Sequence, residues 1–343
     1  MLKNGVEPSV TLYHWDLPLA LQKDFGGWES RECVKYFGEY AAKIGEEFKG
    51  LIKYYCTTNE FLAASDVAYS MGLIAPGLKL PKKRVNQIRH HLLLAHGTAL
   101  SALRAADNEA KISLAENSNF MVPLIDTPEY VDAAKKAFRE CNAHFLTAVM
   151  EGKYLDCYLE KEGDDAPEFT DEDMKIIGQK LDWLGLNIYH GKRLRPAPET
   201  KKGYHIFEET DLARQTGIAD FYFEPAAMYW GCRIAHELYN VPEIRITENG
   251  KRSLTDVLAP DGNVYDDERI RHLRLQLLYL AKAVREGIPV TGYYHWSLMD
   301  NLEWHHGFRP RFGYIYVNYS TLERTPKLSA KWMSEVIKTG RIV

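Results

Sequence analysis

Residues 111–150 combine the two patterns that decide the fold of this chain. Lys111–Glu116 (KISLAE) is a short, mostly apolar run, and the longer amphipathic segment Pro128–Met150 follows it. Thr127 provides an N-cap residue directly before the proline at the first helical position, which is a typical helix start. A strand followed by a helix in this way is one βα unit of a parallel sheet.

The same alternation occurs five more times, so six βα units are predicted in all. The other strand-like runs are Ser9–His14 (SVTLYH), Lys53–Asn59 (KYYCTTN), Leu181–Asn187 (LDWLGLN), Glu243–Glu248 (EIRITE) and Val290–Trp296 (VTGYYHW). Further helical patterns cover Lys82–Ala106, Pro225–Tyr239, Asp267–Glu286 and Pro326–Thr339. Because no linker-like cluster interrupts this order, we expect a single domain over residues 1–343, with Leu194–Gly217 as a long surface excursion.

Composition and charge exclude several classes of protein. The 343 residues carry 43 Lys and Arg against 47 Asp and Glu, so there is no basic excess to neutralise the phosphates of a nucleic acid. No apolar run of 18 residues is present, which argues against a membrane span. The five cysteines are scattered, without a C-x-x-C pair, and no signal-peptide pattern opens the chain. We therefore expect a cytoplasmic protein.

Polar and aromatic side chains end most of the predicted strands, Glu116 among them, and two carboxylates that follow β-branched runs stand out. Glu60 follows the threonine-rich run at Lys53–Asn59, and Glu248 lies in the segment ITENG. In a barrel of parallel strands, residues at the carboxyl ends of the strands build the active site. One such Glu alone is more often an ion-pair partner, but a pair suits glycoside hydrolysis, in which one carboxyl protonates the leaving oxygen and the other attacks or activates water.

Ordered motifs along the chain resemble those of the glycoside hydrolase family 1 β-glucosidases. They are VTLYHWDLP (Val10–Pro18), TTNE (Thr57–Glu60), DWLGLNIY (Asp182–Tyr189), ITENG (Ile246–Gly250) and WSLMDNLEWHHGFRPRFG (Trp296–Gly313). The resemblance implies a (β/α)8 TIM-barrel type fold and a retaining β-glycosidase that hydrolyses unphosphorylated β-D-glycosides without metal or organic cofactor.

The resemblance also implies a role for each matching residue. Glu60 would be the general acid/base, Glu248 the nucleophile, and Tyr189 the hydroxyl that holds the nucleophile in line. Asn59 would contact the sugar 2-hydroxyl, and His14 and Trp304 the side of the 3-hydroxyl. Glu303 would bind the 4- and 6-hydroxyls, and Trp296 would form the stacking floor. Further substrate-binding positions implied by the motifs are Trp15, Asn187 and Phe312.

Two departures from the family pattern stand out. The family usually has proline after its acid/base glutamate, whereas this chain has Phe61. Family members also precede the first motif with two βα units, which supply a sugar-binding Gln and an Arg that pairs with the nucleophile. Only nine residues precede Val10, so about six of the eight units are expected here. An active enzyme and a catalytically impaired barrel that at most binds sugars both remain open.

Other clusters give weaker predictions. The spacing of His90, His91 and His96 does not place two imidazoles at i and i+4, so surface or packing histidines are favoured over a metal site. The acidic run Glu160–Asp173 is expected to be a solvated loop before a helix capped by Thr170. Six strands cannot close a barrel built for eight, so the open edges need a cover. A homo-oligomer, a rearranged loop or helix, or a second polypeptide with the missing units could provide it, and we favour the homo-oligomer.

Overall fold

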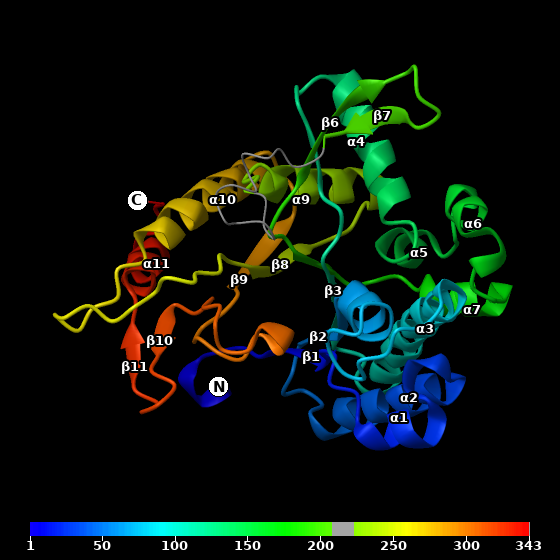
Figure 1. Ribbon diagram of the computed structural model, residues 1–343, viewed down its shortest axis with the longest axis horizontal. Coiled ribbons are helices and arrows are strands. Elements are labelled where there is room, and N and C mark those ends of the chain that lie inside the picture. Colours follow the sequence, from blue (N-terminus) through cyan, green and yellow to red (C-terminus); the bar gives the residue numbers. More distant parts are fainter. Residues whose placement is uncertain (208–222, 343) are drawn as a thin grey trace. The chain divides into compact units, whose positions relative to one another are not determined.

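The computed structural model describes residues 1–207 and 223–342 and has the predicted α/β class (Figure 1). All six predicted runs form strands of one sheet with the order β1-β2-β3-β5-β8-β9. The bounds of these strands are β1 Ser9–Tyr13, β2 Tyr54–Asn59, β3 Lys111–Glu116, β5 Leu184–Asn187, β8 Ile244–Asn249 and β9 Val290–His295.

The chain divides into two compact units. The first comprises Met1–Asn119, Lys136–Leu186 and Tyr239–Ile244, and the second comprises Phe120–Lys135, Asn187–Leu238 and Arg245–Val343. The expectation of a single domain therefore stays a prediction.

In the first unit, β1, β2 and β3 pair in parallel and helices pack beside them. Every residue of β2 is buried, which fits a central strand of a covered sheet. Helices α2 (Arg31–Glu47) and α3 (Lys82–Ala106) lie against each other (Figure 1). A Cβ at Gly45 of α2 would come within 2.7 Å of the Ala106 side chain, so glycine permits this close approach. The shorter helices are α1 Leu19–Phe25, α5 Leu146–Glu151, α6 Asp156–Glu162 and α7 Asp171–Ile177.

The predicted helix Pro128–Met150 is wrong as one element, because it is broken in two. Helix α4 spans Pro128–Cys141, and α5 begins at Leu146. At the break, the Asn142 side-chain amide donates to the Phe138 carbonyl at 2.8 Å, and its oxygen accepts from the Asn119 backbone N–H at 2.8 Å. Asparagine side chains that bond to the backbone in this way compete with helical hydrogen bonding.

The acidic run is a solvated loop only in part. Thr170 does cap α7, in a reciprocal capping box with Asp173. Glu162 and Asp173, however, are buried, because each has a basic partner: Lys82 at 2.8 Å and Arg31 at 2.6 Å, respectively. The prediction overlooked these partners because they lie far away in the sequence.

The second unit contains a small sheet that the sequence did not indicate. Strand β6 (Lys192–Ala197) pairs with β4 (Met121–Pro123) on one side and with β7 (Gly203–Ile206) on the other. The expected surface excursion Leu194–Gly217 is therefore wrong at its start, where Leu194 is fully buried, and residues 208–217 lie outside the described part of the chain.

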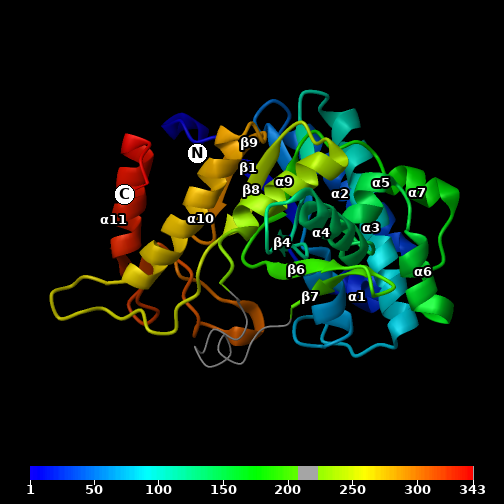
Figure 2. The ribbon, with the colours of Figure 1, turned by 90° about the horizontal axis from the view of Figure 1, so that it is seen from above.

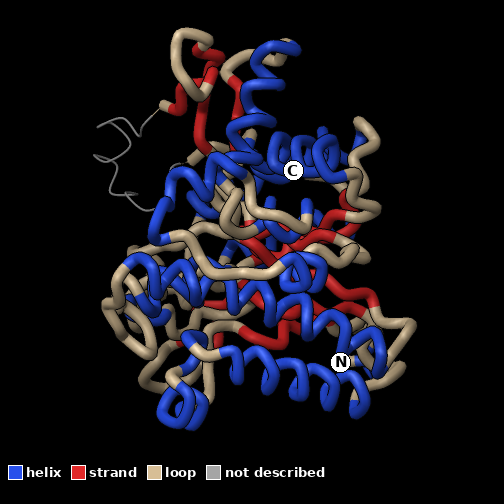
Figure 3. The backbone as a smooth tube through the Cα atoms, turned by 90° about the vertical axis from the view of Figure 1, so that its right-hand side faces the viewer, coloured by secondary structure: helices blue, strands red, loops and turns tan. Residues whose placement is uncertain are grey.

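Helices lie beside strands in the described part of the chain (Figure 3). Helices α10 (Asp267–Arg285) and α11 (Leu328–Thr339) lie side by side (Figure 2). The remaining elements are α9 Ala227–Tyr239, β10 Ile315–Val317 and β11 Arg324–Pro326, the last two paired antiparallel. Within residues 1–207 and 223–342, no helix has the length and apolar character needed to cross a bilayer.

The three histidines of α3 are packing residues, as predicted. His90 contacts the Tyr154 hydroxyl at 3.1 Å, His91 the Trp28 carbonyl at 2.8 Å, and His96 the Thr57 hydroxyl at 2.6 Å. The part of the chain that the structure describes contains no group of three or more His, Cys, Asp or Glu side chains arranged to hold a metal ion.

Candidate active site

The end of β2 places Glu60 in a constrained turn of the first unit. Asn59 is the last residue of the strand and is 2% exposed. Glu60 follows with φ 45°, and its backbone N–H donates to the Ala115 carbonyl of β3 at 2.8 Å. A left-handed backbone at a residue other than glycine costs about 1–3 kcal/mol and is typical of functional sites. The neighbouring strand thus holds the half-buried Glu60 in a conformation that is unfavourable for a free chain.

Three other predicted residues of the first unit lie around Asn59. The indole N–H of Trp15 donates to the Asn59 carbonyl at 2.8 Å, and the Asn59 amide lies 3.3 Å from Nε2 of His14. Burial lowers the pKa of His14, which favours the neutral imidazole. The register that pairs Tyr13 with Thr58 brings the ends of β1 and β2 together. His14, Trp15, Asn59 and Glu60 therefore form one polar and aromatic cluster.

Glu248 and Tyr189 meet in the second unit. The Tyr189 hydroxyl donates to Oε2 of Glu248 at 2.8 Å, and the Ile188 N–H donates to the Glu248 backbone carbonyl at 2.9 Å. Tyr189 is 6% exposed, so its orientation is fixed by packing. A hydroxyl donor on one carboxylate oxygen orients the carboxylate and favours its charged form. Nearby, Asn187 is fully buried, and its side-chain oxygen accepts from the Thr247 hydroxyl at 2.6 Å.

Trp296 is attached to the segment that follows Glu248. Its backbone N–H donates to the Asn249 carbonyl at 2.8 Å, and the Tyr293 hydroxyl donates to Oδ1 of Asn249 at 2.8 Å. A Cβ at Gly250 would lie 2.1 Å from the Trp296 carbonyl oxygen. The glycine of ITENG is therefore required, because any side chain there would push Trp296 away.

Glu303, Trp304 and Phe312 lie in the segment after β9. Glu303 is half-buried. Its backbone N–H donates to the Gly307 carbonyl at 2.8 Å, and its backbone carbonyl accepts from the His306 N–H at 2.8 Å. Burial raises the pKa of Glu303, while a hydrogen bond from Trp296 and the charge of Arg252 act in the opposite direction. Trp304 has φ 41°, again in the left-handed region. The structure thus brings Glu303 and Trp296 together.

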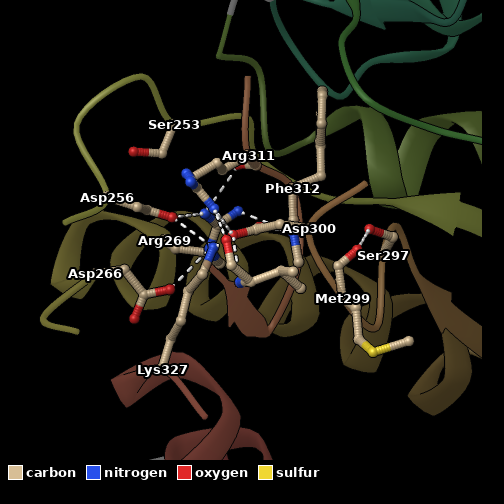
Figure 4. A network of polar contacts seen from close by, with 12 residues as sticks. Ser253, Asp256, Asp266, Arg269, Ser297, Met299, Asp300, Arg311, Phe312 and Lys327 are labelled. Atoms are coloured by element: carbon tan, nitrogen blue, oxygen red, sulfur yellow. Dashed lines mark hydrogen bonds and ion pairs between the residues drawn. The ribbon is translucent and has the colours of Figure 1, made fainter. Parts of the chain in front are cut away.

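A buried ionic network anchors this segment (Figure 4). Lys327 is fully buried, with Nζ 2.6 Å from Asp256 and 2.8 Å from Asp300. Asp300 also accepts from the Gly313 N–H at 3.0 Å, and Arg269 donates to the Phe312 carbonyl at 3.2 Å. Ion pairs without access to water are rigid, so the network fixes the backbone around Glu303 and Phe312.

Backbone strain coincides with the predicted residues. The described residues include five with positive φ that are not glycine: Trp15, Glu60, Asn240, Trp304 and Leu322. Three of these five belong to the predicted site. Strain of this kind persists only where the surrounding structure enforces it, which supports a functional role for these positions.

The sequence reasoning did not include Glu116 among the site residues. This carboxyl ends β3, is 1% exposed, and accepts a hydrogen bond from the Phe61 backbone N–H at 3.0 Å. Its place at a strand end was the available signal, but its link to the residue after Glu60 depends on strand pairing.

Comparison with known proteins identifies the class. The model of glycosyl hydrolase family 1 matches residues 1–341. The chain belongs to this family.

Relatives in the family are enzymes of similar sequence and fold. The chain is 36% identical to β-glucosidase A of Thermotoga maritima over 341 residues, which are 99% of this chain and 75% of the relative. It is 33% identical to β-glucosidase A of Acetivibrio thermocellus, covering 99% of this chain and 76% of that protein. A solved structure of the T. maritima β-glucosidase in complex with deoxynojirimycin superimposes with a TM-score of 0.84 at 35% identity, covering 98% of this chain and 75% of that one.

Proposed function

We propose that this chain is a retaining β-glycosidase of the β-glucosidase type, with Glu248 as nucleophile and Glu60 as general acid/base. The observation that carries the proposal is the hydrogen bond from the Tyr189 hydroxyl to Oε2 of Glu248 at 2.8 Å, which orients the carboxylate of the nucleophile. The strained turn at Glu60 and the relatives named β-glucosidase support the same assignment.

The proposed reaction has two displacements. In the first, Glu248 forms a bond to the anomeric carbon as the bond to the leaving oxygen breaks, and Glu60 gives its proton to that oxygen. In the second, Glu60 takes a proton from water, the water oxygen bonds to the anomeric carbon, and Glu248 is released. No step requires a metal, so EDTA is expected to leave the rate unchanged.

The remaining predicted residues are proposed to bind the sugar. Asn59 and His14 would contact the 2- and 3-hydroxyls. Trp296, Glu303 and Trp304 would provide the stacking surface and the contacts to the 3-, 4- and 6-hydroxyls. An indole ring suits the C–H face of a pyranose, and a carboxylate can accept from two neighbouring hydroxyls. We assign auxiliary contacts with the sugar to Trp15, Asn187 and Phe312.

We further propose that the chain supplies six of the eight βα units of a family barrel and assembles as a homo-oligomer. The six-stranded order of the main sheet and the three quarters of each relative that is covered support this proposal. Association would cover the outer strands β1 and β9.

Glu248→Gln and Glu60→Gln test the assignment, together with the wild-type chain. We expect wild type to release chromophore from an aryl β-glucoside and both variants to lose turnover of unactivated β-glucosides by about 100-fold or more. Azide is expected to restore turnover in a Glu248→Ala variant and to give the α-glycosyl azide. In a Glu60→Ala variant, azide is expected to restore turnover and to give the β-glycosyl azide. Sugar binding by a wild-type chain that releases no chromophore would instead identify an impaired barrel.

A further inference from the structure

The turn that carries Glu60 is fastened to β3 at two successive backbone N–H groups. Glu60 N–H donates to the Ala115 carbonyl at 2.8 Å, and Phe61 N–H donates to the Glu116 carboxyl at 3.0 Å. Ala115 and Glu116 are the last two residues of β3, and Ala115 pairs with Asn59 in the sheet. The end of β3 therefore supports both sides of the strained residue.

The second of these hydrogen bonds depends on the residue after Glu60. Phe61 begins a helical stretch, and a proline at a first helical position has no N–H and needs no acceptor. Phe61 is 1% exposed, so water cannot accept a hydrogen bond from its backbone N–H. A buried donor without a partner costs about 1–3 kcal/mol. Glu116 supplies the acceptor that this departure from the usual family motif requires.

Glu116 fits this task as a neutral carboxylic acid. Burial raises its pKa well above 4.5, the Phe61 hydrogen bond lowers it, and the nearby charge of Glu60 raises it again. Its carbonyl oxygen can accept from Phe61 without placing a second negative charge beside Glu60.

We propose that Glu116 is a positioning residue for Glu60. The buried carboxyl of Glu116 fixes the Glu60–Phe61 turn by accepting the hydrogen bond from the Phe61 N–H. This inference rests on the proposed role of Glu60 as acid/base and deepens it. When Glu116 is removed, the turn loses one of its two attachments to β3, and the Glu60 carboxyl moves from the position that delivers a proton to the leaving oxygen.

A loss of proton delivery has a specific kinetic signature. An alkyl leaving group is strongly basic and needs the proton, whereas a dinitrophenolate departs without it. The experiment compares kcat/KM for an alkyl and a dinitrophenyl β-glucoside in wild type, Glu116→Leu and Glu116→Gln. In Glu116→Leu we expect a loss of about 10- to 100-fold with the alkyl glucoside and of about threefold or less with the dinitrophenyl glucoside. Glu116→Gln keeps an oxygen acceptor and is expected to recover most of the loss.

Asp107→Leu is the matched control. Asp107 is also buried in the first unit and also accepts a backbone N–H, from Gly50 at 3.0 Å, but it precedes β3 instead of ending it. We expect this variant to lower the melting temperature without changing the ratio of the two kcat/KM values. If Glu116→Leu does not fold, Glu116→Asp replaces it, because aspartate keeps the carboxyl on a shorter side chain. We expect its ratio of kcat/KM for the alkyl glucoside to kcat/KM for the dinitrophenyl glucoside to lie between the ratios expected for Glu116→Gln and Glu116→Leu.

The outcomes separate this inference from the proposed function. Equal losses for both substrates in every Glu116 variant, or no loss in any, would overturn the positioning role while wild-type activity upholds the glycosidase. A wild-type chain that cleaves neither glucoside, or a Glu60→Gln variant that cleaves both as well as wild type, would overturn the proposed function and the inference with it.

Discussion

At the residue scale, we expect the carboxyl group of Glu303 to determine which sugars the proposed site binds and how the charge of the site depends on pH. Glu303 is half-buried, and burial raises its pKa, with Trp296 and Arg252 acting against the shift. Its ionised form would suit neutral hydroxyl donors and would repel an anion. Substrate choice should therefore depend strongly on charge at the sugar 6-position.

We predict that neutral β-glucosides are cleaved in preference to their 6-phosphates. A phosphate carries about −1.5 to −2 charges at pH 7, and its repulsion by Glu303 should lower kcat/KM by about 100-fold or more. Steady-state kinetics on the paired aryl glycosides measure the ratio. Faster cleavage of the phosphorylated compound would show that the role given to Glu303 is wrong.

We predict that Glu116→Gln changes how stability depends on pH. In the folded chain Glu116 keeps its proton above pH 4.5, where the unfolded chain loses it, so wild-type folding is progressively disfavoured as pH rises above that value. Glutamine has no such proton. The free energy of unfolding of the variant relative to wild type should rise with pH by up to about 1.4 kcal/mol per unit. Urea unfolding from pH 4 upward measures it, and a pH-independent difference would contradict the buried neutral carboxyl.

At the scale of elements, an ionic network holds the segment that bears Glu303. Lys327 precedes α11 and bonds to Asp256 and Asp300, while Asp300 receives the Gly313 N–H (Figure 4). Helix α11 and the segment around Gly313 are thus connected through one buried ammonium. Removing that charge takes one of two basic partners from each buried carboxylate, because Asp256 keeps Arg269 at 2.7 Å and Asp300 keeps Arg311 at 2.6 Å.

We predict that Lys327→Met destabilises the fold by about 3–5 kcal/mol and also raises KM for β-glucosides. The control is Lys331→Met, because Lys331 is an exposed lysine of the same helix and should change stability by less than about 0.5 kcal/mol. Denaturant unfolding and steady-state kinetics test the pair. Equal stability of the two variants would mean that the network does not anchor this segment.

Elements with a strong local pattern could be predicted from the sequence, and those set by distant contacts could not. The six strands follow from short β-branched and aromatic runs between amphipathic segments. The break before α5 depends on Asn142 bonding to Asn119, which is 23 residues away. In the small sheet, β4 pairs with β6 although about 70 residues separate the two strands.

The same distinction applies to the candidate site. The residues at strand ends and in the family motifs were predictable, and the structure gives Tyr189 and Glu248 the expected contact. Glu116 was not among the predicted site residues, because its proposed role depends on the Phe61 N–H in the turn after the neighbouring strand β2. A strand-end glutamate is visible in a sequence, but the donor it serves is not.

At the scale of the whole molecule, the outer strands of the main sheet are the unusual feature. Within the described residues, β1 and β9 each have one neighbouring strand, and both have exposed positions along their length. Unpaired strand edges tend to associate with other chains. The cytoplasmic location expected from the cysteines and the N-terminal sequence stays a prediction.

We predict that the chain is a homo-oligomer in solution and that Val10→Lys on β1 dissociates it and lowers its stability. A charge on an edge strand opposes edge-to-edge association. Ile337→Lys is the control, because Ile337 is 75% exposed and belongs to helix α11 instead of an outer strand. Light scattering at low micromolar concentration measures the mass. A monodisperse wild-type monomer that unfolds cooperatively would contradict the prediction.

The proposed mechanism passes through a covalent bond between Glu248 and the sugar, and this intermediate can be trapped. An activated 2-deoxy-2-fluoro-β-glucoside reacts with a retaining nucleophile because its leaving group needs no acid, while the fluorine slows hydrolysis of the ester. Mass spectrometry of the intact chain and of its peptides should find one fluoroglucosyl group per chain, located on Glu248. An adduct on another residue, or no adduct in a preparation that hydrolyses the parent glucoside, would contradict the account.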